Sequence, residues 1–574
     1  MTPNHSGSTA DKQGIPSLQD KSGKTAETDE EKAEALNQQF CSVFTETEYD
    51  SVPFHNKTYS KMKEIKITIK GVEKILKSIN PTKAMGPDGI HPRVLKELST
   101  ELAVPLTHFF QQSIDEGKIP EDWQTANICP LFKKNDRSTP SNYRPVSLTC
   151  IICKLLEHII CSNLMQHFEE QNILNDRQHA FRKHHSCETQ LVNVINDWAK
   201  SIDNRKQVDI FILDFEKAFD TVPHELLKSK LQKYGVPKNI LNWIDNFLGN
   251  RSQCVVVNGT KSTSKPVISG VPQGTVLGPI LFLIHINDIS ENISSNIRLF
   301  ADDCVCYREI NTENDCKELQ KDIDKLGKWA TTWGMRFQPV KCNMMTLSRK
   351  KKNVTFNYTL KNTTLEFLTS IKYLGVHISN DLHWGKHIEE TCNKAYRTLG
   401  LLRRNLTSCP QEVKLQAYKG LIRPVLEYAS AAWDPHQEYL QEKLENVQKR
   451  AARFITSNYE YNEGVMTSIL QELNLPPLKD RRAQSRLILL FKGINEQAKL
   501  PTDELSVPKR RTKTMHEHHY LRPRTKTDTL KYSFMPNTIK DWNSLPGKTI
   551  NTALESSDPV KSFVEIVRGG SCSK

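Results

Sequence analysis

Apolar residues follow two spacings along the chain, and the change between them separates strand-like from helix-like segments. The spacing of three and four residues in CKELQKDIDKLGKWATTWG (316–334) predicts an amphipathic helix. Short, nearly continuous apolar runs predict buried strands at 208–215 (VDIFILDF), 253–259 (QCVVVNG), 297–307 (IRLFADDCVCY), 342–348 (CNMMTLS) and 371–379 (IKYLGVHIS). Because strands and helices mix without regular alternation, the pattern predicts an α+β fold.

The segments around this mixed region have different patterns. Residues 1–28 are rich in Ser, Thr, Gly and Lys and predict a disordered leader. Amphipathic stretches predict a helical N-terminal extension over 29–112, before the mixed region at 113–379. Helical spacing dominates 380–460, and 461–574 is a basic C-terminal region that reads as irregular from about residue 505.

Composition restricts the class of protein. The chain has 574 residues, enough for roughly three or four packing units. No apolar run approaches the length of about 18 residues that a membrane span requires, so we expect no membrane partner. The start has no signal-peptide pattern and the 14 cysteines lack paired spacing, which predicts an intracellular protein of the nucleus or cytoplasm, not a secreted one. The net charge of +13 suits a polyanionic partner.

Two adjacent acids, Asp302 and Asp303, interrupt an apolar run and are predicted to lie at the tip of a strand–turn–strand hairpin. Buried or clustered carboxylates are costly unless a cation pairs with them. Asp214 ends another strand-like run and supplies a third acid. Three carboxylates could hold two Mg²⁺ ions about 3.5–4 Å apart, the arrangement used for phosphoryl transfer. The alternative is that Asp302 and Asp303 are solvated turn residues.

An ordered series of motifs resembles the reverse transcriptases of LINE-type (non-LTR) retrotransposons, in particular the jockey-like group. Five stretches of this chain resemble the successive palm motifs of that family: LDFEKAFD (213–220), SGVPQGTVLGPILF (269–282), FADD (300–303), GMRFQPVKC (334–342) and YLGV (373–376). Four stretches that precede them in the chain are similar to the finger motifs of the family: GPDGIHP (86–92), LFKKND (131–136), SNYRPVSL (141–148) and LLEHII (155–160). Three later stretches are similar to the C-terminal region of the jockey-like group: LIRPVLEYASAAWDP (421–435), NVQKRAARFI (446–455) and DWNSLP (541–546).

The resemblance implies a right-hand polymerase with fingers and an antiparallel palm sheet at 113–379 and a helical thumb at 380–460. It implies an RNA-directed DNA polymerase that adds deoxynucleoside triphosphates to a DNA primer on an RNA template. In this family the primer would be nicked chromosomal DNA. Only a short polar stretch precedes the finger motifs, so we expect the endonuclease to reside on another polypeptide.

The resemblance also assigns the catalytic groups. Asp214 and Asp302 would be the principal metal ligands, with Asp303 auxiliary and the backbone carbonyl of Phe215 a further ligand. The cofactor would be two Mg²⁺ ions, with Mn²⁺ as the alternative. Lys341 would act as general acid toward the leaving pyrophosphate; a structural role is the alternative.

Further positions imply contacts with the nucleotide. Phe219 lies five positions after Asp214, where a bulky ring can exclude the ribose 2′-hydroxyl, and this disfavours an RNA-synthesising polymerase. Gln273 would brace the template base and the incoming sugar. Gly274 would let the backbone approach the nucleotide closely.

Basic side chains are the candidates for phosphate binding. Arg144, together with Lys133 or Lys134, would hold the triphosphate, because Arg offers a planar fork of donors. In the basic C-terminal region, nucleic-acid contacts are predicted for Arg510, Arg511, Lys513, Arg522 and Arg524, with a solvated tail as the alternative.

One loop departs from the family pattern. Relatives usually have Gly where Ala180 stands and a Gly-containing turn near His184 and His185. This departure favours the alternative of a degenerate or host-adopted copy that binds nucleic acid without synthesis. The intact acids Asp214, Asp302 and Asp303 favour an enzyme.

Overall fold

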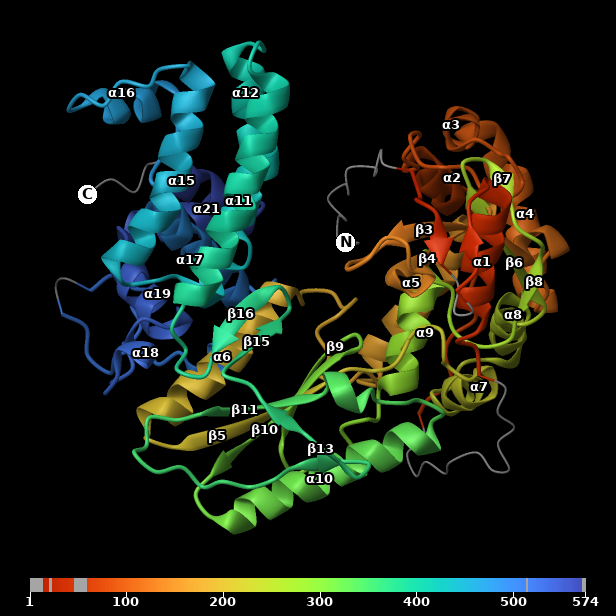
Figure 1. Ribbon diagram of the computed structural model, residues 1–574, viewed down its shortest axis with the longest axis horizontal. Coiled ribbons are helices and arrows are strands. Elements are labelled where there is room, and N and C mark those ends of the chain that lie inside the picture. The colour runs from red at the N-terminus through yellow and green to blue at the C-terminus, as the bar shows by residue number, and fades with distance from the viewer. Residues whose placement is uncertain (1–13, 20–22, 46–58, 513–514, 570–574) are drawn as a thin grey trace. The chain divides into compact units, whose positions relative to one another are not determined.

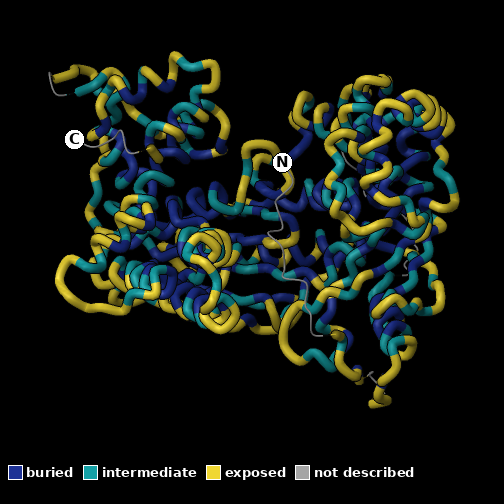
Figure 2. Tube along the Cα trace, turned by 90° about the horizontal axis from the view of Figure 1, so that it is seen from above, coloured by how far each residue is buried: buried dark blue, intermediate teal, exposed yellow. Residues whose placement is uncertain are grey.

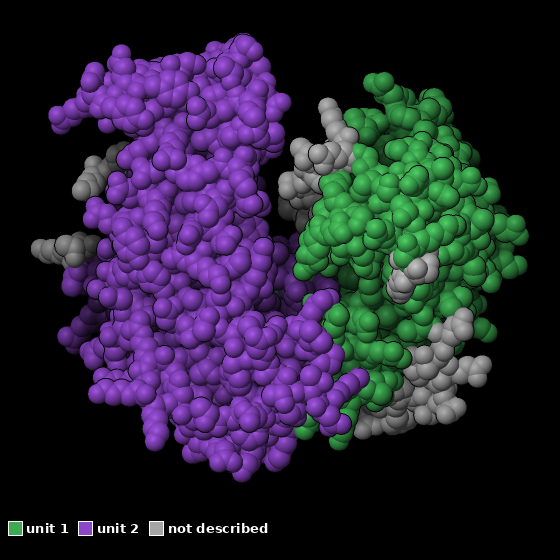
Figure 3. All heavy atoms as spheres, in the orientation of Figure 1, with its two compact units in different colours: residues 1–181, 214–293, 323–338 green, residues 182–213, 294–322, 339–574 purple. Residues whose placement is uncertain are grey.

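The computed structural model describes residues 14–19, 23–45, 59–512 and 515–569. The chain forms two compact units, each assembled from separate stretches of sequence (Figure 3). Unit 1 comprises residues 1–181, 214–293 and 323–338, and unit 2 comprises 182–213, 294–322 and 339–574. Because the units interleave in the sequence, the contiguous domains expected from the sequence stay predictions.

Unit 2 is built on a five-stranded sheet, the central sheet, in the order β14-β11-β5-β10-β9 (Figure 1). All neighbours pair antiparallel except β11 and β14. The predicted apolar runs at 208–215, 297–307 and 342–348 form four of these strands, which are β5 (Gln207–Leu213), β9 (Asn296–Phe300), β10 (Asp303–Ile310) and β11 (Asn343–Leu347). The short strand β14 (Glu366–Phe367) was not predicted. Together with the helices, this sheet confirms the predicted α+β fold.

A tight hairpin joins β9 to β10. Phe300 pairs with Asp303, and Ala301 in the turn has a φ of 52°. Strand β5 lies on the other side of β10, and its last residue, Leu213, pairs with Cys304. The predicted hairpin with acids at its tip is confirmed, and the strand that ends before Asp214 is its neighbour in the sheet.

Helices complete unit 2 around a continuous apolar core that the central sheet shares with helix α6 (Cys187–Asp203) and the C-terminal helices. The hairpin β15 (Ser370–Tyr373) and β16 (Val376–Ser379) also contributes to this core, whereas β12 (Thr359–Leu360) and β13 (Thr363–Thr364) form a separate small hairpin. The helices that follow are α11 (Gly385–Leu406), α12 (Gln411–Ala417), α13 (Arg423–Glu427), α14 (Ser430–Trp433), α15 (Glu438–Thr456), α16 (Val465–Glu472) and α17 (Leu478–Ile494).

The C-terminal region is more ordered than predicted. Trp542 and Phe563 are buried, and the Phe563 ring stacks on Phe491 of α17 with 4.2 Å between the centroids. The prediction of an irregular tail from about residue 505 is therefore wrong for its second half, because these aromatic residues give it a core. Its helices are α18 (Asp528–Lys531), α19 (Phe534–Asn543), α20 (Gly547–Leu554) and α21 (Pro559–Arg568).

Unit 1 has its own five-stranded sheet, in which β4, β3, β6 and β7 follow one another and β8 also pairs with β6. Its strands are β3 (Thr125–Phe132), β4 (Tyr143–Leu148), β6 (Arg251–Val257), β7 (Thr260–Lys261) and β8 (Lys265–Val267). Its helices are α1 (Asp29–Cys41), α2 (Ile69–Lys77), α3 (Pro92–Glu97), α4 (Ser99–Glu116), α5 (Ile151–Glu170), α7 (His224–Lys233), α8 (Lys238–Leu248) and α9 (Leu277–Ile286). Helix α10 (Glu313–Thr332) begins in unit 2 and ends in unit 1.

Part of the predicted disordered leader is ordered. Strand β1 (Leu18–Gln19) pairs with β2 (Thr25–Ala26). Leu18 is fully buried in a cluster with Leu36 and Phe40 of α1. The prediction is wrong for these residues because a single apolar side chain anchors the segment; residues 1–13 and 20–22 lie outside the described residues.

Buried, intermediate and exposed residues follow one another at short intervals along much of the described chain, as Figure 2 shows by colour. The longest helix of the described chain, α11, is amphipathic: it buries Ile388, Ala395 and Leu399 and exposes charged residues between them. Across the described ranges, no helix combines the length and the apolar character needed to cross a membrane.

Candidate active site

The predicted acids lie at the end of the central sheet where β5 ends beside the turn that joins β9 to β10. Leu213 pairs with Cys304. Asp214 is one peptide bond beyond Leu213, and Asp303 is one peptide bond before Cys304, so the antiparallel register brings their backbone positions to the same end of the ladder. Asp302 and Asp303 are both exposed, while Asp214 is partly buried.

The donor set suits a hard divalent cation. Carboxylate oxygens are the ligands that Mg²⁺ prefers, and the hairpin tip presents two carboxylates in adjacent positions. Within the described part of the chain, however, no three Asp, Glu, His or Cys side chains are gathered as a metal site. The residue types and the backbone register fit a cation, and the convergence of all three carboxylates stays a prediction.

The segment after Asp214 is held by a second backbone pairing. Phe215 forms an isolated antiparallel bridge with Phe337, and their rings stack with 4.4 Å between centroids. The amide of Gln338 donates to the carbonyl of Asp214 at 2.9 Å, and the amide of Glu216 donates to the carbonyl of Arg336 at 2.8 Å. Neither bond of this bridge uses the Phe215 carbonyl, the predicted metal ligand.

Lys341 lies close to the same strands. It ends a short 3₁₀ helix, Pro339–Lys341, and its side chain is exposed. Two residues later, Asn343 begins β11 and pairs with Ile212 of β5. The backbone thus brings Lys341 to the end of β5 that leads into Asp214, as its predicted role requires, but its contact with a leaving group stays a prediction.

Gln273, in the loop Ser269–Thr275, is held by one hydrogen bond of its side chain and one of its backbone. Its side-chain Nε2 donates to Oδ1 of Asp220 at 2.9 Å, and its carbonyl accepts from the amide of Ser147 at 2.7 Å. Gly274 has a φ of +104°, and a Cβ added there would lie 2.8 Å from the carbonyl oxygen of Ser147. Glycine is therefore required for the loop to approach β4 so closely.

Asp220 is a site residue that the sequence analysis missed. It ends the LDFEKAFD motif, so the signal was present, but no role was given to it. Burial raises the pKa of its carboxyl group, while the hydrogen bond from Gln273 and the charges of Lys217 and Arg144 act in the opposite direction. Asp220 thus links the loop to the segment that begins at Asp214.

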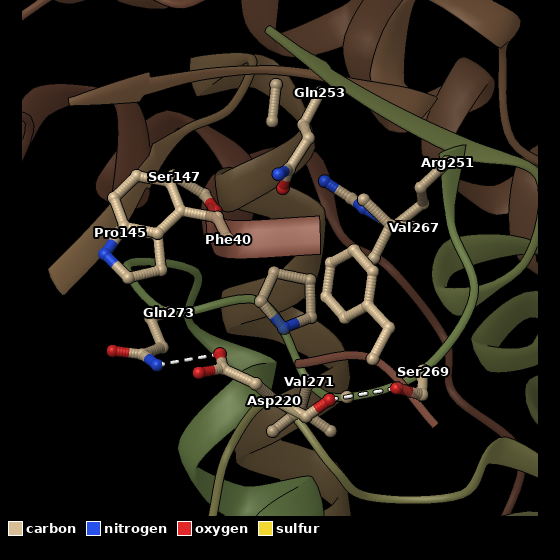
Figure 4. A pocket seen from close by; sticks show the side chains of 14 residues that line it. Phe40, Pro145, Ser147, Asp220, Arg251, Gln253, Val267, Ser269, Val271 and Gln273 are labelled. Atoms are coloured by element: carbon tan, nitrogen blue, oxygen red, sulfur yellow. Dashed lines mark hydrogen bonds between the residues drawn. The ribbon is translucent and has the colours of Figure 1, made fainter. Parts of the chain in front are cut away.

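A small cavity lies behind this loop (Figure 4). Asp220, Gln273, Arg251 and Phe40 are among the residues that line it, and Ser269 Oγ donates to the Asp220 carbonyl at 2.9 Å. Its volume of about 40 Å³ holds a few water molecules, at roughly 10–15 Å³ each, and is too small to enclose a nucleobase. The cavity therefore lies beside the predicted nucleotide loop and shares Asp220 and Gln273 with it.

Glu157 of the LLEHII motif supports the same loop from helix α5. Its side chain is fully buried, and one carboxylate oxygen accepts the amides of Val276 and Leu277 at 2.7 and 3.0 Å. These amides begin helix α9, where a carboxylate is favourable. Burial raises the pKa of Glu157. Sequence reasoning used this motif only as a family signal and missed its role as a helix cap.

Phe219 is held in place by a second ring. It stacks on Phe282 of α9 with 4.5 Å between centroids and 18° between planes. Its carbonyl accepts from the amide of Val271 at 2.7 Å. Phe219 is only partly buried, and the stack on Phe282 fixes the orientation of its ring. Its role in excluding a ribose hydroxyl stays a prediction.

The predicted triphosphate ligands lie together on the sheet of unit 1. Arg144 of β4 pairs with Leu131 of β3, and Lys133 and Lys134 follow the end of β3 directly. All three basic side chains are exposed. The structure thus brings the three to one end of the β3–β4 ladder without deciding between the two lysines.

Comparison with known proteins identifies the central part of the chain. Residues 132–378 match the family described as reverse transcriptase (RNA-dependent DNA polymerase). Residues 132–378 are a reverse transcriptase domain. The family resemblance that the motifs predicted is confirmed, since the segment includes the acids, the loop at Gln273 and the YLGV motif.

Relatives of this reverse transcriptase domain extend the similarity over most of the chain. The chain is 25% identical over 481 residues to the probable RNA-directed DNA polymerase from transposon BS of Drosophila melanogaster, covering 80% of the chain and 53% of the relative. It is 26% identical over 477 residues to the RNA-directed DNA polymerase from mobile element jockey of the same species, covering 79% and 51%. The Drosophila funebris jockey polymerase is 28% identical over 386 residues, covering 63% and 41%. The chain spans about half the length of the first two relatives.

The loop that departs from the family pattern lies within the reverse transcriptase domain. Ala180 is buried, and His184 has a φ of 65°, a conformation that glycine adopts more readily. The carbonyl of His184 accepts from the amide of Lys499 at 2.9 Å, so this turn is anchored to the C-terminal region. A histidine thus occupies the left-handed conformation that the glycine-containing turn of relatives would favour.

The basic C-terminal residues lie beyond the reverse transcriptase domain. Arg510, Arg511 and Arg524 are exposed in irregular segments, and Lys513 lies outside the described residues. Arg522 donates from Nε to the Pro536 carbonyl at 3.1 Å. Arg522 is thus partly committed to holding its own segment, and nucleic-acid contact by this set stays a prediction.

Proposed function

We propose that this chain is an RNA-directed DNA polymerase of a mobile element that copies RNA by adding deoxynucleotides to the 3′ end of a DNA primer. The pairing of Leu213 with Cys304 carries the proposal, because it brings the positions of Asp214 and Asp303 to one end of adjacent strands within a reverse transcriptase domain. The same register favours metal binding by these acids over the alternative that Asp302 and Asp303 are solvated turn residues.

Asp214, Asp302 and Asp303 would hold the divalent cations, Mg²⁺ or alternatively Mn²⁺, with the Phe215 carbonyl as a further oxygen ligand. When bound, the cations would lower the barrier to phosphoryl transfer by stabilising the negative charge on the attacking and leaving oxygens. The primer 3′-hydroxyl would lose its proton to solvent as its oxygen bonds to the α-phosphorus, and the bond from that phosphorus to the bridging oxygen would break and release pyrophosphate. Lys341 would donate a proton to the pyrophosphate that leaves.

The nucleotide would lie between the loop at Gln273 and the basic end of the β3–β4 ladder. Arg144 with Lys133 or Lys134 would bind the triphosphate. Gln273, held by Asp220, would position the sugar and template base, and Phe219 would exclude a ribose 2′-hydroxyl. The bonds that fix Gln273 and Phe219 support these roles because a rigid group orients a substrate better than a mobile one.

The partners would be an RNA template, a DNA primer and deoxynucleoside triphosphates. The relatives named above are RNA-directed DNA polymerases of transposons and mobile elements. By the family resemblance, the primer would be nicked chromosomal DNA. An endonuclease on another polypeptide would then supply the 3′-hydroxyl. Exposed Arg510, Arg511 and Arg524 would add phosphate contacts that weaken as salt rises.

Primer extension on poly(rA)/oligo(dT) tests the proposal. We expect Mg²⁺-dependent incorporation of dTTP by the wild-type protein, and in Asp302→Ala a rate at least about a thousandfold lower, since several kcal/mol of transition-state stabilisation is lost. Asp503→Ala is the control, because this exposed acid lies in the 3₁₀ turn Thr502–Glu504, outside the reverse transcriptase domain. Undiminished incorporation by Asp302→Ala would rule out the assigned site.

A protein that binds nucleic acid without synthesis is the second candidate. The loop at Ala180 and His184 favours it, since these residues depart from the glycine pattern expected of the family. This candidate predicts salt-sensitive RNA binding by the wild-type protein together with no incorporation by any variant.

A further inference from the structure

Helix α1 is anchored on the sheet of unit 1 by apolar and polar contacts. Its residues Leu36 and Phe40 are buried in one apolar cluster with side chains of β3, β4 and β6. Asn37 is fully buried, and its side chain accepts from Nε2 of Gln253 at 3.1 Å and donates to the Thr263 carbonyl at 2.8 Å. Because a buried polar group is costly to leave without its partner, these bonds give α1 one defined place on the sheet.

The chain that leaves α1 reaches the predicted nucleotide loop at 269–275. The amide of Thr45 donates to Oγ of Ser269 at 2.9 Å. Ser269 is 2% exposed, and its Oγ donates in turn to the carbonyl of Asp220 at 2.9 Å. A single hydroxyl group therefore joins three parts of unit 1, which are the segment that follows α1, the nucleotide loop and the segment that follows Asp214.

Two further bonds connect the nucleotide loop to the segment that carries Phe219 and Asp220. The amide of Val271 donates to the carbonyl of Phe219 at 2.7 Å. The side chain of Gln273 donates to the carboxylate of Asp220 at 2.9 Å. Phe40 of α1 lines the same small cavity as Gln273 (Figure 4). The groups predicted to orient the nucleotide are thus bonded to the same short segment that the loop's first hydroxyl links to α1.

The nucleotide loop depends on such bonds because of its glycines. Gly270 and Gly274 have φ values of +87° and +104°. Glycine loses more conformational freedom on folding than other residues, so a loop with two of them is ordered only when contacts outside it offset that loss. The bonds of Ser269 to Thr45 and Asp220 are contacts of this kind.

We propose that Ser269 is a positioning residue through which helix α1 holds the nucleotide loop in the conformation that accepts a deoxynucleoside triphosphate. The proposal rests on the proposed function, which assigns this loop to the nucleotide. It adds a contribution from outside the reverse transcriptase domain, because α1 and Thr45 precede residues 132–378. Helix α1 acts without contacting the substrate, since a loop that is competent less often binds its ligand with a proportionally lower apparent affinity.

The first test compares Ser269→Ala with Ser262→Ala. Ser262 is the matched control, because its Oγ accepts from Nδ2 of Asn37 on α1 at 3.0 Å and from the amide of Val255 at 2.9 Å. We expect Ser269→Ala to raise KM for dTTP about three- to tenfold in primer extension, with kcat within about twofold of wild type. Ser262→Ala should match wild type in both constants. A merely structural role of Ser269 would reduce the amount of active protein, and therefore kcat, and leave KM unchanged.

The second test removes the same bond from the side of α1. Thr45→Pro deletes the amide that donates to Ser269, whereas Thr45→Ala keeps this amide and loses only the bond of its hydroxyl to the Thr221 carbonyl at 3.4 Å. We expect Thr45→Pro to raise KM for dTTP as Ser269→Ala does, and Thr45→Ala to match wild type. A normal KM in Thr45→Pro overturns the part assigned to α1. If thermal unfolding shows that Thr45→Pro does not fold, Phe40→Leu, which shortens the α1 side chain at the cavity, takes its place with the same expected result.

Hydrogen exchange of residues 271–282 measures the order of the nucleotide loop without synthesis. We expect these amides to exchange about three- to tenfold faster in Ser269→Ala and Thr45→Pro than in wild type, and at the wild-type rate in both controls. Unchanged exchange in Ser269→Ala overturns the proposal in an active or an inactive protein. Faster exchange with an unchanged KM in an active protein also overturns it. An inactive wild-type protein overturns the proposed function alone, and the exchange rates then decide whether α1 orders the loop.

Discussion

The side chain of Gln273 donates to the carboxylate of Asp220 at 2.9 Å. This bond connects two motifs that are about fifty positions apart in the sequence, the loop that approaches β4 and the segment that follows Asp214. A group predicted to orient the nucleotide is thereby held by the segment that carries a predicted metal ligand.

Removing the Asp220 carboxylate should loosen Gln273. We expect Asp220→Ala to lower kcat/KM for the deoxynucleotide by about tenfold, since a hydrogen bond to a charged group contributes about 1.5–3 kcal/mol. Asp220→Asn is the matched control: its amide oxygen can still accept from Gln273, so it should retain most activity. Steady-state kinetics with varied dTTP would measure both, and equal kcat/KM for Asp220→Ala and wild type would contradict the brace.

Gly274 tests the close approach of the loop to β4. Gly274→Ala should destabilise the loop by about 1–3 kcal/mol and reduce incorporation, because the added methyl group would press on the Ser147 carbonyl. Gly259→Ala is the control, because Gly259 also has a positive φ, +89°, but a Cβ added there would have no atom within 4 Å. Thermal unfolding and primer extension of the two variants separate the close contact from backbone strain, and equal losses would argue against a special role for Gly274.

Phe219 should set sugar selectivity. Phe219→Ala is expected to raise ribonucleotide incorporation relative to deoxynucleotide by about 10–100-fold, the range over which a pocket discriminates a single added group. Phe282→Leu is the comparison, because it removes the stacking partner and keeps the Phe219 side chain. Competition between UTP and dTTP measures the ratio. Unchanged exclusion of UTP in Phe219→Ala would show that this ring only packs.

His285 should make unit 1 sensitive to acid. Burial, together with the charge of Lys230, lowers the pKa of His285 to about 3, and its Nε2 lies 3.0 Å from the Trp333 carbonyl. Between pH 6.5 and 3 the unfolded chain binds a proton that the folded protein does not, so stability falls as pH falls, by on the order of 4 kcal/mol. Urea unfolding of His285→Gln should show a weaker pH dependence in this range. His108→Gln, an exposed change on α4, should leave it as in wild type.

The turn at His184 should tolerate glycine. Because His184 has a φ of 65°, His184→Gly is expected to raise the free energy of unfolding by about 0.5–1 kcal/mol. The neighbouring exposed residue provides the control: Lys183 is not in the left-handed region, so Lys183→Gly should destabilise. Chemical denaturation compares them. A stability loss in His184→Gly would mean that the histidine side chain contributes more than its backbone costs.

Much of the site was predictable because its signals are local. An apolar run with a tight turn predicts a hairpin from residues 297–307 alone, and the structure forms it. The acids, Phe219 and Gln273 stand in short motifs whose order indicated the reverse transcriptase family. The roles of Glu157 and Asp220 were missed although their motifs were quoted, because a carboxylate in a motif does not reveal from which distant amide it will accept a hydrogen bond.

The sequence by itself determined the strands at 208–215, 297–307 and 342–348, the turn that presents Asp302 and Asp303, and the family, because periodicity and residue type are properties of neighbouring residues. Only the tertiary structure decided that β5 lies beside β10, that Leu18 orders part of the leader and that Trp542 and Phe563 give the C-terminal region a core. Such contacts form between residues far apart in the chain. Their free energy comes from burying shared apolar surface, which no short stretch of sequence contains.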